Sequence, residues 1–340
     1  MLFIDWQLPD HENTADQDRV SRPLPKRAAL PSSPFHPAAG IAILRGVIFR
    51  KITIIGVGLL GGSLGLAVRR GGLAVEVAGY VRRDATANDC ESVGAVDYAT
   101  TDLLAAVSGA DLVVLCTPLA QMRAVTEQFL PALKKGAIVT DVGSVKAGVV
   151  RDLEALVAKA GAHFVGGHPM AGGEKMGVKA SRADLYHGAI CIITPTKRSH
   201  AGSLRKLEQF WRALGSRTVR MDAAEHDRLV SRSSHLPHLV AAVLARVVLD
   251  PRQPREQATL CATGFRDTSR LAAGSPEMWR DISMSNRKNL ARATEAFIAE
   301  LTRFQAVLKG GDAAAIEAFF AGAKTLRDNW CLNTTVVPTE

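Results

Sequence analysis

The stretch KITIIGVGLLGGS, residues 51–63, decides the fold of this chain. A run of mostly β-branched apolar residues leads into Gly-x-Gly-x-x-Gly, and a helical pattern follows over residues 64–70. A strand, a glycine turn and a helix in this order are typical of a dinucleotide-binding unit. Gly56 would allow the tight turn, Gly58 the approach of a pyrophosphate, and Gly61 the close packing of helix on strand. A glycine-rich turn without a ligand is the alternative interpretation.

Strands and helices alternate as far as residue 196, which predicts a mostly parallel, doubly wound sheet of the Rossmann-like α/β class. Further strands are expected at 75–81, 112–116, 137–141, 163–166 and 189–194, with helices at 119–133 and 146–160. Beyond residue 196 the pattern is helical, at 203–214, 223–249, 276–309 and 312–330. The span 276–309 is too long and too apolar for a solvated surface helix. We therefore expect a homodimer through this half, with a monomeric helical bundle as the alternative.

The domain plan that follows is a disordered leader at 1–46, a dinucleotide-binding domain at 47–198, a helical substrate and dimerisation domain at 199–331, and a tail at 332–340. Prolines interrupt any periodicity in the leader, at Pro23, Pro25, Pro31, Pro34 and Pro37. One hypothesis from this change of composition is that translation starts near residue 47 or 48.

Composition narrows the class of protein. The 340 residues carry 42 Lys and Arg against 33 Asp and Glu, a net charge of +9 that suits anionic ligands. The basic residues are scattered and aromatics make up only 5%, which argues against a nucleic-acid partner. We expect no membrane span and no signal peptide. Five cysteines without a CxxC pair favour reduced thiols in the cytoplasm over disulfides or a zinc cluster.

Candidate chemistry lies where predicted strands end, because ligands of such sheets sit at the carboxyl edge. Thr117 and Pro118 follow one strand, where a nicotinamide ring could lie against a turn without an N–H. Ser144 and Lys146 follow the next and offer a hydroxyl and an ammonium at a helix start. His168 follows a third, between glycines and a proline, a position suited to proton transfer; a structural histidine is the alternative.

Two patches in the helical half carry further candidates. His235 and His238 are three residues apart and so share a helix face, but no carboxylate pattern accompanies them, and we expect no metal site. Arg266 and Arg270 are four apart, a spacing suited to gripping a carboxylate. For Arg266 the alternative interpretation is a salt bridge with the neighbouring Asp267.

Five motifs in combination resemble those of the prephenate/arogenate dehydrogenases of tyrosine biosynthesis. They are GVGLLGGS (56–63), TDVGSVK (140–146), GGHPMAGGE (166–174), SHLPH (234–238) and GFRDTSRLAAGSPEMWRDI (264–282). The resemblance covers about residues 50–330. It implies an NAD(P)-dependent oxidoreductase with a nucleotide-binding domain and a helical dimerisation domain. The implied reaction is the oxidative decarboxylation of prephenate to 4-hydroxyphenylpyruvate, with arogenate dehydrogenase, which gives tyrosine directly, as the alternative.

The resemblance also implies roles for individual residues. His168 would accept a hydrogen bond from the ring hydroxyl of the substrate, and Ser144 would orient that histidine or the hydroxyl. Arg270 would hold a carboxylate of a small dicarboxylate substrate, with His238 and, less directly, His235 lining its pocket. Glu174 could pair with the ammonium of arogenate, although it could equally be solvated or pair with Lys175.

The cofactor is expected at the glycine turn and its surroundings, formed by Gly56, Gly58, Leu59, Leu60, Gly61, Arg82, Arg83, Thr117 and Pro118. The position near Val81, usually acidic in NAD-binding proteins, is apolar here and two arginines follow, which favours NADP over NAD unless Asp84 folds back. Two other classes remain open at this point. One is a 3-hydroxyacid or imine-type reductase, and the other is a non-catalytic nucleotide-sensing protein.

Overall fold

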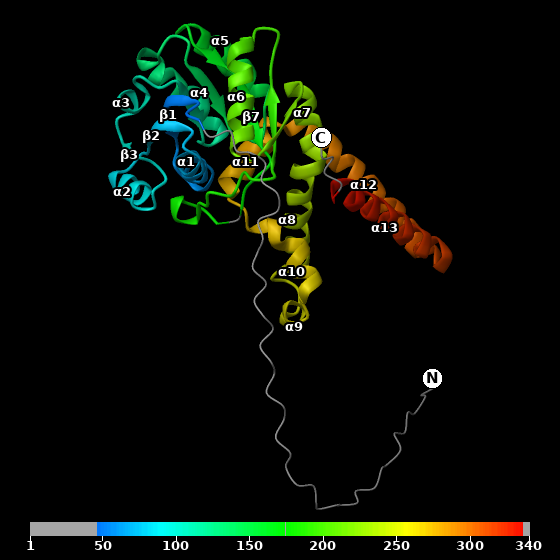
Figure 1. Ribbon diagram of the computed structural model, residues 1–340. Coiled ribbons are helices and arrows are strands. Elements are labelled where there is room, and N and C mark those ends of the chain that lie inside the picture. The colour runs from blue at the N-terminus through cyan, green and yellow to red at the C-terminus, as the bar shows by residue number, and fades with distance from the viewer. Residues whose placement is uncertain (1–45, 174, 336–340) are drawn as a thin grey trace, which may run out of the picture. The chain divides into compact units, whose positions relative to one another are not determined.

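The computed structural model describes residues 46–173 and 175–335 (Figure 1). The predicted leader, apart from its last residue, and Glu174 lie outside the described residues. Strands are β1 (Phe49–Ile55), β2 (Ala74–Tyr80), β3 (Tyr98–Thr100), β4 (Leu112–Leu115), β5 (Ile138–Asp141), β6 (His163–Phe164), β7 (Gly166–Pro169), β8 (Ile190–Thr194) and β9 (Arg217–Arg220).

The helices of the first half cover the sheet. They are α1 (Leu59–Gly71), α2 (Asp84–Ser92), α3 (Leu103–Val107), α4 (Leu119–Phe129), α5 (Ala147–Ala158) and α6 (Ala201–Ala213), with the short turns η1 (Leu130–Ala132) and η2 (Val178–Ala180). The helices of the second half are α7 (Ala223–Val230), η3 (Ser231–His235), α8 (Leu236–Val248), α9 (Arg255–Thr259), α10 (Thr263–Ser269), η4 (Arg270–Ala273), α11 (Pro276–Ser285), α12 (Arg287–Gly310) and α13 (Ala313–Thr335).

The main sheet is parallel throughout, in the order β3-β2-β1-β4-β5-β6, and helices cover both of its faces (Figure 1). Successive side chains of a strand point to opposite faces, so Ile54 packs in the core with α1 and α6, whereas Ile55 packs in the core with α3, α4 and α5. Both residues are fully buried, as expected for strands covered on two sides. The doubly wound sheet predicted from the sequence is confirmed.

A second, smaller sheet has the order β7-β8-β9 and corrects two details of the prediction. The strand expected at 163–166 is two strands: β6 completes the main sheet, and β7 pairs antiparallel with β8. Strand β9 pairs with β8 beyond the domain boundary expected at residue 198, so α6 and β9 belong with the sheets rather than with the helical half. The sequence missed β3 and β9 because each is a short, partly exposed edge strand with little hydrophobic periodicity.

Two long helices expected in the second half are interrupted. The span 223–249 contains a π-type turn, Ser231–His235, between α7 and α8. Pro237 follows at once and lacks the N–H that would bond the residue four positions earlier, which accounts for the widened turn. The span 276–309 breaks at the buried Asn286, where α11 ends and α12 begins. At the first break the buried His235 lies next to the Ser144 backbone, and at the second the buried Asn286 donates to the Asp227 backbone carbonyl.

The last two helices, α12 and α13, lie side by side (Figure 1) and are held together by ring contacts such as Phe304 with Phe319, whose centroids are 4.6 Å apart. Helix α13 continues to Thr335, beyond the tail boundary expected at residue 332. No helix within residues 46–173 and 175–335 is both long and apolar enough to cross a membrane.

Candidate active site

Three strand ends meet at one edge of the main sheet. Ile55 of β1 is level with Leu115 of β4, and Leu115 is level with Asp141 of β5. The glycine turn, the Cys116–Pro118 turn and the segment 142–146 therefore leave the sheet together. The sheet order reverses direction between β1 and β4, which is where open α/β sheets bind their ligands.

The glycine turn has the geometry predicted for it. Gly56 has φ +94°, a left-handed conformation that side chains rarely adopt. A Cβ on Gly61 would stand 2.2 Å from the carbonyl oxygen of Gly56, so only glycine permits this close packing. Around Gly58 there is open space within 4 Å of an added Cβ. Thr117 Oγ1 is buried nearby without a hydrogen-bond partner among the described residues, and the edge therefore fits a polar ligand.

A buried ion pair ties the second sheet to this edge. Lys146 and Asp141 are both fully buried, and their ammonium and carboxylate groups form a hydrogen-bonded pair. Lys146 Nζ also donates to the carbonyl oxygen of Gly167 in β7, at 2.8 Å, while the Gly167 N–H lies 3.3 Å from Asp141 Oδ1. Burial lowers the pKa of Lys146, and the Asp141 carboxylate opposes this effect. The pair holds β7 against the carboxyl end of β5.

His168 lies inside β7, level with Ile192 of β8, rather than beyond the end of a strand, where the sequence placed it. Its side chain is buried, and Nδ1 lies 2.7 Å from Nε2 of His226 on α7. Burial, followed by His226, Lys146 and His235, holds the pKa of His168 well below its usual value. At neutral pH the ring is an uncharged imidazole that can accept a proton.

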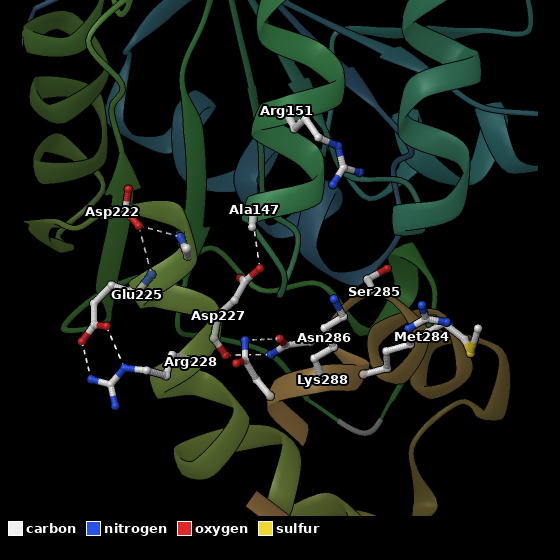
Figure 2. A pocket seen from close by; sticks show the side chains of 13 residues that line it. Ala147, Arg151, Asp222, Glu225, Asp227, Arg228, Met284, Ser285, Asn286 and Lys288 are labelled. Atoms are coloured by element: carbon white, nitrogen blue, oxygen red, sulfur yellow. Dashed lines mark hydrogen bonds and ion pairs between the residues drawn. The ribbon is translucent and has the colours of Figure 1, made fainter. Parts of the chain in front are cut away.

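Asp227, beside His226 in sequence, connects the two domains (Figure 2). Its Oδ1 accepts hydrogen bonds from the Lys146 N–H at 2.7 Å and from His226 Nδ1 at 2.8 Å, and Oδ2 accepts from the Ala147 N–H at 2.9 Å. The carboxylate thereby satisfies free N–H groups at the start of α5, where the helix dipole favours negative charge. Asn286 Nδ2 donates to the Asp227 backbone carbonyl at 2.7 Å.

The histidines of the SHLPH segment lie near this centre. His235 is buried, its Nδ1 faces Asn286 Nδ2 at 3.2 Å, and burial lowers its pKa to about 4. His238 Nδ1 donates to the Ser234 carbonyl at 3.0 Å, which leaves Nε2 as an acceptor. The Trp279 ring lies 4.0 Å from the His238 ring and 6.1 Å from the His235 ring.

Two buried N–H-bearing atoms here have no partner among the described residues: His235 Nε2 and Trp279 Nε1. Buried polar atoms left unpaired are costly, so a pocket that presents them suits a polar ligand. No cluster of three or more metal-binding side chains occurs in the part of the chain that the structure describes.

The remaining predicted residues are distributed as follows. The Ser144 backbone lies next to His235, and the hydrogen bond that orients the His168 ring comes from His226 instead of Ser144. Arg270 begins η4, which packs against α8, and its side chain is exposed. Arg82 and Arg83 are exposed after β2. Leu59 and Leu60 open α1, and Pro118 precedes α4.

Sequence reasoning missed His226, Asp227 and Asn286. The sequence held one weak indication of them. His226 and Asp227 lie three or four residues from both Ala223 and Val230, and so on the same face of the helix. An ordinary surface helix carries apolar residues on that face. Two adjacent titratable residues on such a face require buried partners.

A cavity of about 630 Å³ lies where α5, α7 and the start of α12 meet (Figure 2). Asp227, Asn286 and Lys288 line it, whereas His168 is not among the described residues that do so. The cavity therefore belongs to the junction between the domains and not to the immediate surroundings of His168.

Two features together define a nicotinamide-dependent dehydrogenase. One is a doubly wound sheet with a glycine turn at its switch point, and the other is a buried neutral histidine at the same edge. The model of the prephenate dehydrogenase nucleotide-binding domain matches residues 64–220, and that of the prephenate dehydrogenase dimerization domain matches residues 222–322. The chain belongs to the prephenate dehydrogenase family. The division at 220–222 agrees with the position of β9 and replaces the boundary expected at residue 198.

Individual relatives agree with this assignment. The chain is 33% identical over 268 residues to cyclohexadienyl dehydrogenase of Zymomonas mobilis, covering 78% of this chain and 90% of that one. It is 32% identical over 283 residues to prephenate dehydrogenase of Bacillus subtilis, covering 82% and 75%. The crystal structure of A. aeolicus prephenate dehydrogenase with hydroxyphenyl propionate and NAD+ is similar to it with a TM-score of 0.77 and 32% identity, over 82% of this chain and 98% of that one.

Proposed function

We propose that this protein oxidises and decarboxylates prephenate to 4-hydroxyphenylpyruvate in tyrosine biosynthesis. The observation that carries the proposal is the neutral, buried His168 at the ligand-binding edge of the nucleotide-binding sheet, in a chain of this family. The alternative classes considered from the sequence, a hydroxyacid or imine reductase and a nucleotide sensor, would not require a proton acceptor at this position.

His168 acts on the ring hydroxyl of the substrate. A bound nicotinamide supplies the hydride acceptor for the carbinol carbon. As that carbon gains carbonyl character, His168 takes up the hydroxyl proton, and its burial excludes water from the transfer. Loss of CO2 returns an electron pair to the ring, and His168 returns the proton to the phenolate oxygen. Prephenate and the oxidised coenzyme thus give 4-hydroxyphenylpyruvate, CO2 and the reduced coenzyme with no net proton.

The substrate carboxylates are assigned to the helical half. Arg270 would bind one carboxylate, and His238 would offer the acceptor Nε2 to the substrate. His235 lines the same region, with its unpartnered Nε2. Ser144 would contact the hydroxyl. Glu174 stays a prediction outside the described residues, and it matters for arogenate because only that substrate carries an ammonium.

Replacing Arg270 with alanine is expected to raise KM for prephenate by about ten- to hundredfold, because a bidentate, charge-assisted contact is lost. The change should leave kcat within a small factor, since the arginine holds a group that does not react. Steady-state kinetics measures both. Arg266→Ala, at an arginine one helical turn earlier on α10 that is also exposed, is the matched control. An unchanged KM in Arg270→Ala would remove this arginine from the site.

We propose NADP as the preferred coenzyme. Val81 is buried and apolar where an acidic residue would select NAD, and the exposed Arg82 and Arg83 follow it. Asp84 is exposed, and its Oδ1 accepts a hydrogen bond from Thr101 Oγ1 at 3.1 Å. NAD, which the A. aeolicus relative holds, is the competing choice.

One experiment tests substrate and coenzyme together. The purified protein is incubated with prephenate or arogenate and with NAD or NADP, and the absorbance of the reduced nicotinamide is followed. The highest kcat/KM is expected for prephenate with NADP. Faster turnover of arogenate would change the substrate, a higher kcat/KM with NAD would change the coenzyme, and no turnover in any combination would overturn the proposed function.

We also infer a homodimer formed through the last helices. Several large apolar side chains of α12 and α13 are more than half exposed in the single chain, namely Ile298, Leu301, Leu308, Phe320, Leu326 and Trp330. An apolar surface of this kind is typical of a subunit interface. The dimerization-domain match, which covers α12 and the start of α13, supports the inference. A mass of one chain in sedimentation equilibrium would contradict it.

A further inference from the structure

Beyond the residues that would touch the substrate, a line of three side chains ends at His168. The Asp227 carboxylate faces His226 Nδ1 at 2.8 Å, and His226 Nε2 faces His168 Nδ1 at 2.7 Å. All three residues are buried, with exposed fractions of 3%, 0% and 6%. Water therefore does not compete for these contacts, and each polar atom must find its partner within the protein.

The direction of the hydrogen bonds follows from the chemistry of the groups. An ionised carboxylate can only accept, so Asp227 requires the proton of His226 on Nδ1. A His226 ring whose single proton is held on Nδ1 has a bare Nε2, which can only accept, and this requires the proton of His168 on Nδ1. The bare nitrogen of His168 is therefore Nε2, the one that is not engaged with His226.

The anchor of this line is fixed from several sides. Asp227 Oδ1 also accepts the N–H group of Lys146 before α5. Its Oδ2 accepts from the Ala147 N–H, and its backbone carbonyl accepts from Asn286 (Figure 2). The amide orientation of Asn286 is set in turn, because its Oδ1 accepts from Asn289 Nδ2 at 2.9 Å. The carboxylate cannot turn away from His226 without leaving helix N–H groups unpaired.

We propose that His226 and Asp227 are positioning residues that hold His168 in the tautomer with a bare Nε2, ready to accept the substrate hydroxyl proton. When His168 takes that proton, the imidazolium donates to His226, and the Asp227 carboxylate stabilises the added charge through the line. The role of the line in turnover rests on the proposed function, whereas the tautomer itself does not.

Two substitutions of His226 separate positioning from packing. His226→Phe keeps a planar ring but removes both nitrogens, whereas His226→Gln offers an amide oxygen to His168 and an amide N–H to Asp227. We expect the phenylalanine variant to lower kcat by about 10- to 100-fold with little change in KM, because a correctly held base contributes at least this much. Glutamine should recover most of that loss. His163→Phe, at a histidine that stacks on His200 with centroids 4.3 Å apart, controls for the change of ring.

The tautomer of His168 distinguishes positioning from packing, because a change in packing alone would not alter it. It is measured from the ¹⁵N chemical shifts of the His168 ring. The unaltered protein and His226→Gln should show the proton on Nδ1, and His226→Phe should shift it toward Nε2. A proton on Nε2 in the unaltered protein would overturn the inference, whatever the activity. If the tautomer is as expected but no cyclohexadienol substrate turns over, the proposed function fails and the positioning of His168 stands.

Discussion

Replacing His168 with asparagine is expected to lower kcat by about 10²- to 10⁴-fold, the range that a positioned acid–base group contributes. Asparagine fits the small buried site and can still hydrogen-bond to His226, but it cannot take up the hydroxyl proton. Dinucleotide affinity should stay nearly unchanged, because the glycine turn is carried by a different strand, β1. Steady-state turnover and a direct titration with the coenzyme measure the two quantities.

The pH dependence of the unaltered protein provides a second check on His168. The groups that face it are His226 on α7, Lys146 before α5 and His235 on η3, and with burial they lower its pKa well below 6.5. The neutral ring is the active form, so kcat/KM should hold steady as pH falls to 6.5 and decline only at lower pH. His168→Asn should lack this acidic limb. Near-normal turnover in that variant would remove His168 from the chemistry, and His163→Asn serves as its matched control.

The second large effect is expected from Lys146→Met, which should reduce the free energy of unfolding by about 3–5 kcal/mol. The methionine fills the space of the lysine stem, but it leaves the fully buried Asp141 carboxylate without its counter-charge. It also removes the 2.8 Å hydrogen bond to the Gly167 carbonyl that holds β7. Urea denaturation followed by circular dichroism measures the loss.

A matched exposed lysine shows whether burial is the cause. Lys324 pairs with Asp328 on α13 with 77% of its side chain exposed, so Lys324→Met should change stability by less than about 1 kcal/mol. Combining Lys146→Met with Asp141→Asn should cost less than the sum of the two single changes, because no charge is then left unpaired. Equal effects at the two lysines would contradict the role given to the buried pair.

The same variant tests the electrostatics around His168. Lys146 is one of the charges that lower the pKa of His168, so its loss should raise that pKa. The acidic limb of kcat/KM should accordingly move to higher pH in any folded fraction of Lys146→Met. A limb that stays in place would show that burial and the two neighbouring histidines set the pKa of His168 without Lys146.

Local patterns were enough to predict the main sheet. The strand and glycine turn at 51–61 are recognisable within a dozen residues, because each glycine is required by a backbone contact between near neighbours, such as that of Gly61 with the Gly56 carbonyl. The alternation of apolar strands and amphipathic helices predicted the fold class for the same reason. The edge strands β3 and β9 were not predicted, because three or four partly exposed residues show almost no hydrophobic periodicity.

The candidate site was only partly predictable. The glycines around His168 marked it as unusual, but the sequence placed it beyond the end of a strand, whereas the chain forms β7 of a second sheet there. Its partner His226 is 58 residues away on α7, and the contact of Asp227 with Lys146 spans 81 residues. Nothing local distinguishes such a histidine from one on an ordinary helix face.

The amino-acid sequence by itself determined that this chain builds a dinucleotide-binding sheet followed by helices, and that His168 is set apart at the edge of the sheet. The tertiary structure decided which nitrogen of His168 is engaged, which neighbouring groups help burial to lower the pKa of its ring, and how Lys146 and Asp141 hold β7 in place. The physical reason is that strand and helix patterns arise from neighbours in the chain, whereas proton positions depend on hydrogen bonds that form only when distant elements pack together.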